Sequence, residues 1–346
     1  MKQITLLVVV GLLSVAIGHA QTTAYSPPVG GVAINAAANT DNIISIPLPR
    51  NVAWVGSALS GSGSNITANG TPGWTSNAFA SASLHYVRVL SGVLQGHYFV
   101  ITGNSSDTLT VDPAGLNLSS MVNGDRIEIA PFWTLGTLFP AVNAGSSFIA
   151  SASSLARQTE LLLYDATSTG INRSANAIFY FYNGAWRKAG SSVATSFDNT
   201  VLFPDAFFVQ RNKAAATKLI VVGRVQQSSL STVLEAIVGG ENDNFAAVSF
   251  PVALTLNQTG LATSGFTAST SALSVKDQLL WFDPAGTGTN RSATAIYYYY
   301  NGGWRKKGAS VALEFGSSVV IPAGSGFIVR KAANGVTAPW VFNPRI

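Results

Sequence analysis

The fold is decided by a stretch that occurs twice, NRSANAIFYFYNGAWRK at residues 172–188 and NRSATAIYYYYNGGWRK at residues 290–306. Around it, residues 165–204 align with residues 283–322 without a gap, and about 23 of the 40 positions are identical. Self-similarity on this scale is typical of a repeated structural unit. The sequence therefore predicts two related units.

Each copy contains an Asn-Gly pair between two runs of β-type residues, at 183–184 and 301–302. A type I′ turn needs positive φ at both central residues, and Asn-Gly is the pair that supplies this most readily. We therefore expect one antiparallel hairpin in each copy.

The two faces of the first hairpin strand differ between the copies. Alternate residues of a strand point to opposite sides. One face is identical in both copies and consists, in the first, of Ile178, Tyr180 and Tyr182. The other face changes from Phe179 and Phe181 to Tyr297 and Tyr299. Because a buried hydroxyl without a partner costs about 1–3 kcal/mol, the changing face is expected to reach solvent or a polar rim in the second copy. One face should be covered by the sandwich core and the other by a neighbouring module, another chain or a ligand.

The remainder of the chain also alternates with period two and is rich in Gly, Pro and Asn turns, which predicts an all-β protein. Short alternating runs between residues 61 and 133 are typical of a small β-barrel or meander. Asp-Asn precedes a strand-like run at residues 41–42 and again at 243–244, so each unit is expected to begin with this strand. The one helix candidate is residues 229–237.

The predicted fold is two related β-sandwich-like units with the small barrel or meander inserted in the first. Its expected boundaries are a signal peptide at 1–20, a leader and the first strands of unit 1 at 21–60, the inserted module at 61–133, the rest of unit 1 at 134–222, and unit 2 at 223–346.

The N-terminus has the pattern of a secretory signal peptide. Lys2 precedes an apolar run over residues 4–17, and Gly18-His19-Ala20 places small residues at the third-last and last positions of the segment. We expect cleavage after Ala20 and an exported protein, extracellular or in the cell envelope. The mature chain has no other apolar run long enough for a transmembrane segment.

Composition excludes several classes of protein. There is no cysteine, so disulfides, thiolate metal sites and cysteine nucleophiles are absent. The net charge of +5 comes from a chain in which only 10% of residues are charged, and the basic residues are scattered. Nucleic-acid binding requires a basic stripe, so it is not expected.

The repeated Trp-Arg pair suggests a candidate binding surface. An exposed indole beside polar groups suits a sugar ring, and the alternative is that each Trp packs in the core while the basic side chains point outward. The residues predicted to contact a ligand or partner are Trp186, Trp304, Tyr297, Tyr299, Phe179, Phe181, Arg187 and Arg305.

The loops before the hairpins allow two interpretations. Asp165 with Asn172, and Asp283 with Asn290, could be weak calcium ligands, or their side chains could stabilise ordinary turns. The arginines that follow the two asparagines could form ion pairs with the loop aspartates. No other metal site and no cofactor are expected.

No catalytic residues are predicted. His85 and His97 lack a third ligand at zinc spacing. A carboxylate pair for glycoside hydrolysis would have to come from turn acids of the inserted module, and the candidates are Asp107, Asp112, Asp125 and Glu128.

Several stretches together resemble a family of uncharacterised, exported, β-rich bacterial proteins that are often duplicated within a genome. They are the Asp-Asn strand at 41–47, GHYFVI at 96–101, TLTV at 108–111, WTLGTLFP at 133–140 and the two aromatic hairpins. The resemblance implies a secreted or envelope location and no established activity.

The function hypothesis is an exported, non-enzymatic structural or interaction protein of the bacterial surface or matrix. Its expected partners are other protein chains or further copies of itself. The alternatives are a carbohydrate-binding protein, with a polysaccharide partner, and a glycan-active enzyme.

Overall fold

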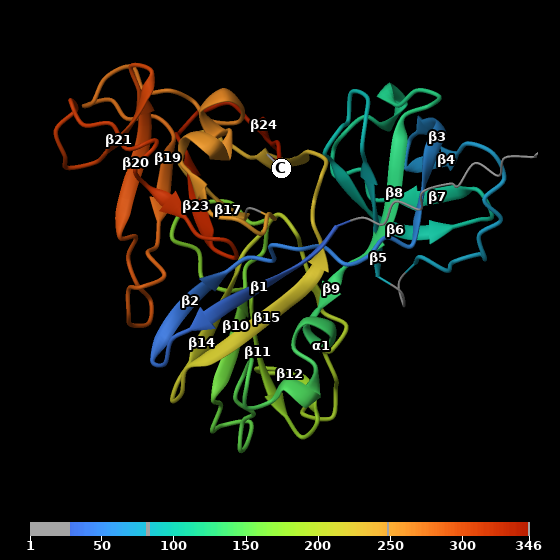
Figure 1. Cartoon of the computed structure of the whole chain (residues 1–346), viewed down its shortest axis with the longest axis horizontal. Helices are drawn as coiled ribbons and strands as arrows, with labels where there is room; N and C mark the ends of the chain where they lie inside the picture. The colour runs from blue at the N-terminus through green and yellow to red at the C-terminus, as the bar shows by residue number, and fades with distance from the viewer. Residues whose placement is uncertain (1–27, 81–83, 248, 345–346) are drawn as a thin grey trace, which may run out of the picture.

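The computed structural model describes residues 28–80, 84–247 and 249–344. The predicted all-β fold is confirmed. Within these ranges the one α-helix is the four-residue α1 (Leu135–Leu138), and the 3₁₀ turns are η1 (Leu118–Ser120), η2 (Ala141–Asn143), η3 (Asn257–Thr259) and η4 (Leu261–Thr263). Figure 1 shows three bodies: a barrel, unit 1 beside it, and unit 2.

Unit 1 is built on a five-stranded antiparallel sheet in the order β12-β11-β10-β14-β2. Its strands are β2 (Thr40–Ile44), β10 (Thr159–Leu163), β11 (Ala177–Tyr182), β12 (Ala185–Lys188) and β14 (Phe208–Asn212). Two ribbons complete the unit: β1 (Val29–Ala36) with β15 (Thr217–Arg224), and β9 (Trp133–Thr134) with β13 (Val201–Leu202).

Unit 2 has a five-stranded sheet in the order β21-β20-β19-β23-β17. Its strands are β17 (Asn242–Ala247), β19 (Gln278–Trp281), β20 (Ala295–Tyr300), β21 (Gly303–Lys306) and β23 (Gly326–Lys331). Its ribbons are β16 (Leu230–Leu234) with β24 (Ala338–Phe342), and β18 (Leu254–Thr255) with β22 (Val320–Ile321). The strand order along the chain therefore matches that of unit 1, with the two aromatic hairpins at the same edge.

The closed barrel has the order β3-β4-β7-β6-β5-β8 and lies in the chain between β2 and β9. Its strands are β3 (Trp54–Ser62), β4 (Asn65–Ala68), β5 (His85–Val89), β6 (Tyr98–Asn104), β7 (Thr108–Val111) and β8 (Arg126–Pro131). The barrel begins at Trp54, upstream of residue 61, because β3 pairs with both β4 and β8. A Cβ at Gly61 would lie 2.3 Å from the Leu118 carbonyl oxygen, so glycine lets η1 close over the barrel.

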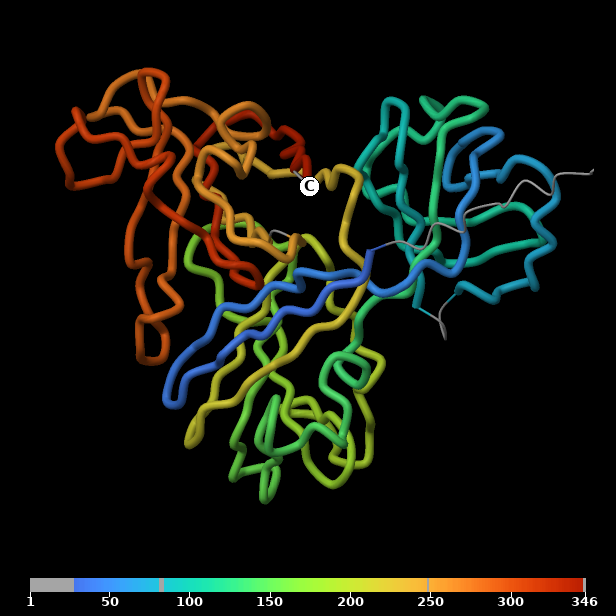
Figure 2. Tube along the Cα trace, viewed as in Figure 1, coloured from blue at the N-terminus to red at the C-terminus, as the bar shows by residue number. Residues whose placement is uncertain are grey.

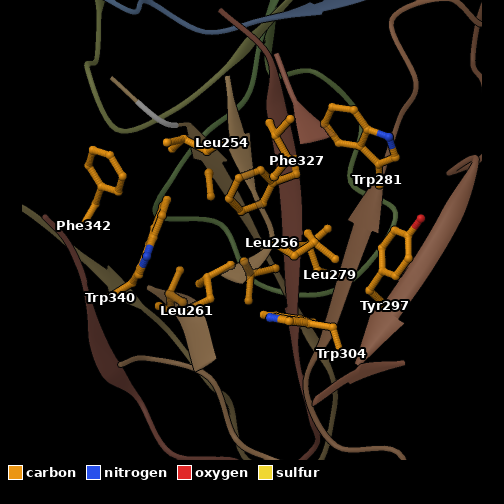
Figure 3. Packing of buried hydrophobic residues seen from close by; sticks show 14 of the residues in the cluster. Leu254, Leu256, Leu261, Leu279, Trp281, Tyr297, Trp304, Phe327, Trp340 and Phe342 are labelled. Atoms are coloured by element: carbon orange, nitrogen blue, oxygen red, sulfur yellow. The ribbon is translucent and has the colours of Figure 1, made fainter. Parts of the chain in front are cut away.

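Each body has its own hydrophobic core. The barrel core contains Val87, Phe99 and Ile127, and the core of unit 1 contains Phe139 and Phe148. Figure 3 shows the core of unit 2, in which residues of β19, β20 and β23 meet residues of the segment 254–261 and of β24. Sheet and ribbons thus enclose one core in each unit, as in a sandwich.

Both Asn-Gly hairpins form as predicted. The φ angles are 49° at Asn183 and 77° at Gly184, and 47° at Asn301 and 71° at Gly302. Positive φ at both central residues is the type I′ requirement. Tyr182 pairs with Ala185 at the end of the first hairpin.

The helix candidate at residues 229–237 is wrong, because residues 230–234 form strand β16 and pair with β24. Leu230 and Leu234 are both buried, and Leu234 lies in the unit 2 core. An i, i+4 pair of leucines fits a helical face as well as a strand face, and only the pairing partner decides between them. The predicted signal peptide lies outside the described residues.

Candidate functional site: the clasp between the units

The changing aromatic face of unit 1 lies in its core. Phe179 and Phe181 are 4% and 7% exposed, and Trp186, which pairs with Phe181 across the hairpin, has no exposed surface. The Trp186 Nε1 donates a hydrogen bond of 3.1 Å to the Phe139 carbonyl. These three predicted contact residues therefore lie in the core, and not on an open face.

The same face of unit 2 is also a core face. Tyr297 is 5% exposed, Trp304 is fully buried, and Tyr299 packs against the same cluster. Figure 3 shows the Trp304 indole inside the cluster and the Tyr297 hydroxyl pointing away from it. An indole without exposed surface cannot stack on a sugar, so the carbohydrate-binding alternative loses the residues on which it rested.

The arginines of the hairpins stabilise local backbone. Arg187 is buried and donates from Nε and Nη2 to the carbonyls of Tyr182 and Asn183, at 3.1 and 3.2 Å. Arg305 donates from Nη1 to the Leu313 carbonyl at 3.0 Å. These bonds are directed at the chain itself, and they give both arginines a local structural role.

The opposite, identical face of the hairpin strand lies toward the other unit. Ile178 packs in a small cluster with Leu162 and Val209 of its own sheet and with Phe245 and Ile328 of unit 2. This face is therefore covered in part by the neighbouring unit.

A reciprocal set of contacts, which we call the clasp, joins the two units. In its first half, Arg211 of β14 binds Asp41 of β2 through two bonds of 2.6 and 2.9 Å. This ion pair, the first receptor, grips the loop at residues 288–291 of unit 2. The Asp41 carboxylate accepts the Asn290 N–H at 2.7 Å, Arg211 donates to Asn290 Oδ1 at 2.9 Å, and Arg291 donates to the Asp41 carbonyl at 3.1 Å.

The second half repeats these bonds with the units exchanged. Arg330 of β23 binds Asp243 of β17 through bonds of 2.7 and 3.0 Å, and this second receptor grips the loop at 170–173 of unit 1. The Asp243 carboxylate accepts the Asn172 N–H at 2.8 Å, and Arg330 donates to Asn172 Oδ1 at 3.1 Å. Arg173 donates to the Asp243 carbonyl at 2.5 Å.

Backbone hydrogen bonds also hold each loop against the receptor of the other unit. The Asp41 N–H donates to the Gly288 carbonyl and the Asp243 N–H to the Gly170 carbonyl, both at 3.0 Å. Figure 2 shows the orange loop of unit 2 lying beside the blue turn that precedes β2. The clasp therefore combines side-chain and main-chain recognition in both directions.

The carboxylates of the clasp favour the charged form of the two arginines that they bind. Hydrogen bonds to Asp41 raise the pKa of Arg211, and hydrogen bonds to Asp243 raise the pKa of Arg330. Burial lowers the pKa of Arg173, whose guanidinium lies 4.4 Å from the centre of the Phe245 ring. The bidentate geometry is the strongest form of an arginine–carboxylate contact.

The four residues of the calcium interpretation all form hydrogen bonds within the protein through side-chain oxygens. Asn172 Oδ1 and Asn290 Oδ1 face guanidinium groups in the clasp. Asp165 accepts bonds from Thr167 and Ser168 in its own turn, and those from Thr167 lower its pKa most. Asp283 accepts the Ala285 N–H at 2.9 Å.

The loop arginines do not form the ion pairs expected with the loop aspartates. Arg173 donates to the carbonyls of Asp165 and Ser168, and Arg291 donates to the Asp283 carbonyl at 3.0 Å. Each arginine thus stabilises its own loop and also donates a hydrogen bond to a backbone carbonyl of the other unit.

Asp41, Asp243, Arg211 and Arg330 were missed as site residues by sequence reasoning. The signal was present, since the Asp-Asn pair occurs in both units, in the strand that comes first in the chain in each sheet. The two arginines follow Pro204 and Pro322 by different numbers of residues, so a gapless alignment does not superimpose them.

A groove of about 700 Å³ runs between the outer faces of the two sheets. Ile178 and Ile296, at equivalent positions of the two hairpins, both line it, and the receptors of the clasp border it. Its apolar lining is the same packing surface that joins the units.

The barrel meets both units at a junction rich in buried polar groups. Tyr98 donates a 2.7 Å bond to Asp205 of unit 1, and burial raises the pKa of both groups, that of Tyr98 strongly. His97 lies 3.1 Å from the Ser231 hydroxyl of unit 2, and burial lowers its pKa. A pocket of about 410 Å³ beside these residues is a further candidate site.

The acids considered for glycoside hydrolysis have structural partners. Glu128 pairs with Arg88 at 2.5 Å and with Arg224 of unit 1 at 2.6 Å, which fastens the barrel to that unit. The other three are bonded in their own turns, with donors from Ser105 and Thr108 to Asp107, from Ala114 to Asp112 and from Val122 to Asp125. In the described ranges, no three His, Asp or Glu side chains group as a metal site would require.

Comparison with known proteins adds no relative: no family model, curated protein or solved structure matches this chain. In the part of the chain that the structure describes, no helix is long and apolar enough to cross a bilayer.

Proposed function

We propose that the protein is an exported, non-enzymatic structural protein of the bacterial cell surface or extracellular matrix, which acts through protein interfaces. The clasp is the observation that carries this proposal. Its loops belong to the stretch that recurs most closely in the sequence, and their polar groups join one β-unit to another. Because both copies of the motif bind the other unit, we assign the motif a structural role.

Surface chemistry supports an interface role. Only 10% of residues are charged, and the outer face of the ribbon β1·β15 exposes apolar side chains: Val29 at 63%, Ile220 at 62% and Val222 at 57%. Exposed apolar strand faces are typical of protein contact surfaces.

Export is tested by producing the full chain in a secreting bacterium and sequencing the N-terminus of the extracellular and envelope fractions. We expect these fractions to hold a chain that begins at Gln21, because the segment ending at Ala20 has the pattern of a cleaved signal peptide. An uncleaved chain confined to the cytoplasm would contradict the proposal.

The interface role is tested on the mature chain by light scattering over a concentration series, together with turnover assays on a panel of polysaccharides. Self-association without turnover is expected. Hydrolysis of any glycan, abolished by substitution of an acid of the barrel, would replace the structural role with an enzymatic one.

A further inference from the structure

Each unit carries both parts of the clasp. Unit 1 contains the receptor Asp41–Arg211 and the loop 170–173, and unit 2 contains the receptor Asp243–Arg330 and the loop 288–291. The two loops share the sequence Thr-Gly-x-Asn-Arg from residues 169 and 287. Their backbones also agree, with φ of 52° at both asparagines and of 105° and 103° at the preceding glycines.

The reciprocity extends beyond the side chains. The Ser45 N–H donates to the Gly324 carbonyl at 2.8 Å, and the Ala247 N–H donates to the Asp205 carbonyl at 3.0 Å. Each bond joins the strand that carries the receptor aspartate to the segment that precedes the arginine strand of the other unit. The surfaces are therefore related as in an isologous contact, in which the same patch is used twice.

We propose that this clasp also joins separate copies of the chain, so that unit 1 of one copy grips unit 2 of a second. The inference rests on the proposed function and names the surface and the partner, a second copy. Only residues 225–229 connect β15 of unit 1 to β16 of unit 2. Exchange of units keeps every clasp bond and rearranges only this linker and its contacts, such as the bond from the Val225 N–H to the Pro28 carbonyl. A short connection of this kind between two units is the condition for domain swapping.

The experiment uses full-length chains with one charge of the first clasp half reversed. Asp41→Arg places a cation beside Arg211 and Arg291, and Arg291→Glu places an anion beside Asp41, so each variant loses that half within its own chain. The substitutions lie in different units. Exchange between the two variants therefore creates one pairing in which both units are wild type at the clasp.

The matched control combines Asp41→Arg with Arg173→Glu. Both of these substitutions lie in unit 1, so every pairing between such chains contains a damaged unit 1, and exchange cannot restore an intact clasp. Each chain of either mixture carries one charge reversal. Arg173→Glu is the unit 1 counterpart of Arg291→Glu and acts on the second half of the clasp, and unit exchange cannot repair it.

The variants of each mixture are co-expressed with different affinity tags, purified over both tags in sequence, and weighed by light scattering. The Asp41→Arg and Arg291→Glu mixture is expected to yield complexes with the mass of one chain of each kind, and the control mixture is expected to yield far fewer. Equal yields from both mixtures, or none from the first, would overturn the proposal.

A milder set, Asp41→Ala with Arg291→Ala against Asp41→Ala with Arg173→Ala, follows the same logic if a charge reversal prevents folding. Near-UV circular dichroism of each variant shows whether the three cores are intact. If wild-type chains self-associate but neither the charge-reversal nor the alanine mixture yields complexes, the clasp does not join the copies. The proposed structural role would then remain. A chain that is never exported and never associates would remove the role itself.

Discussion

The two units use the same backbone framework with different supporting side chains. Trp186 and Trp304 occupy equivalent buried positions, but the indole N–H of Trp186 binds the Phe139 carbonyl, whereas that of Trp304 has no hydrogen-bond partner among the described residues. Each Trp backbone N–H is bound by a carboxylate, from Asp198 in unit 1 and from Glu314 in unit 2, at positions that do not align in sequence. The hairpin geometry is thus maintained by interchangeable partners.

The units also differ in what covers their ribbons. Ser231 of β16 contacts the barrel through His97 and through a backbone bond to Gly96, and a Cβ at Gly96 would lie 2.9 Å from the Ser231 nitrogen. The matching ribbon of unit 1 leaves Ile220 and Val222 exposed. The ribbon of unit 1 also meets the barrel, through the Arg224–Glu128 ion pair at the end of β15, but its outer face stays exposed.

The largest expected difference concerns the two clasp receptors. Asp243→Ala should lower the free energy of unfolding by about 2–5 kcal/mol, because it leaves Arg330 and a loop N–H without their acceptor. Asp41→Ala should cost less, since the Asp41 side chain is 13% exposed against 1% for Asp243 and water can replace part of its contacts. Urea denaturation of both variants measures this, with the exposed turn variant Asp112→Ala as control. Equal losses would mean that the two halves are equally buried in solution.

The hairpin turns should respond alike. Gly184→Ala and Gly302→Ala each force a Cβ into the left-handed region, at φ of 77° and 71°, where nothing lies within 4 Å of the added carbon. The cost is therefore backbone strain alone, about 1–2 kcal/mol in each unit. Thermal denaturation of the two single variants and the double variant should give equal and additive losses. A clear inequality would show that the two turns are not equivalent.

The buried tryptophans should respond differently. Trp186→Phe and Trp304→Phe remove similar volumes from their cores, but only the first removes a hydrogen bond and leaves the Phe139 carbonyl unpaired. Trp186→Phe should therefore be the more destabilising by about 1 kcal/mol. Chemical denaturation at matched conditions measures the difference, and a larger loss for Trp304→Phe would contradict the assignment of its indole N–H as unbonded.

The smallest expected effect is a pH dependence at the contact that only unit 2 makes with the barrel. Burial lowers the pKa of His97, so the unfolded chain takes up this proton at a higher pH than the folded chain. Its contribution to stability is complete above the ordinary histidine pKa, near 6.5, and is lost as the pH falls through the lowered folded value.

Substitution of this histidine isolates its contribution. The unfolding free energy of His97→Gln should fall less than that of wild type as the pH drops below about 6.5. Asp205, whose pKa is raised by burial, contributes stability that is lost as the pH rises through its folded value, and this opposite trend remains in both proteins. If His97→Gln and wild type lose the same stability below pH 6.5, the contact between His97 and Ser231 does not discriminate between the neutral and the protonated imidazole.

The predictions from sequence succeeded where local chemistry decides the structure. The Asn-Gly turns, the period-two alternation and the all-β class follow from backbone preferences that act over a few residues. They failed where a choice depends on what packs against a strand. Phe179 and Tyr297 look like an adjustable outer surface when the copies are compared, yet both rings lie in cores, because a phenol can bury its ring and direct its hydroxyl to the edge.

The sequence by itself determined the repeated hairpin, its turn and the identity of the loop motif, since these depend on residues that are neighbours in the chain. Only the tertiary structure decided what the loop motif does. Asp41 and Arg291 lie far apart in the chain, and nothing local specifies that the turn of one unit will meet the receptor of the other. That assignment arises when two sheets of equal strand order pack with their outer faces together, because the loop of each unit then meets the aspartate–arginine pair of the other.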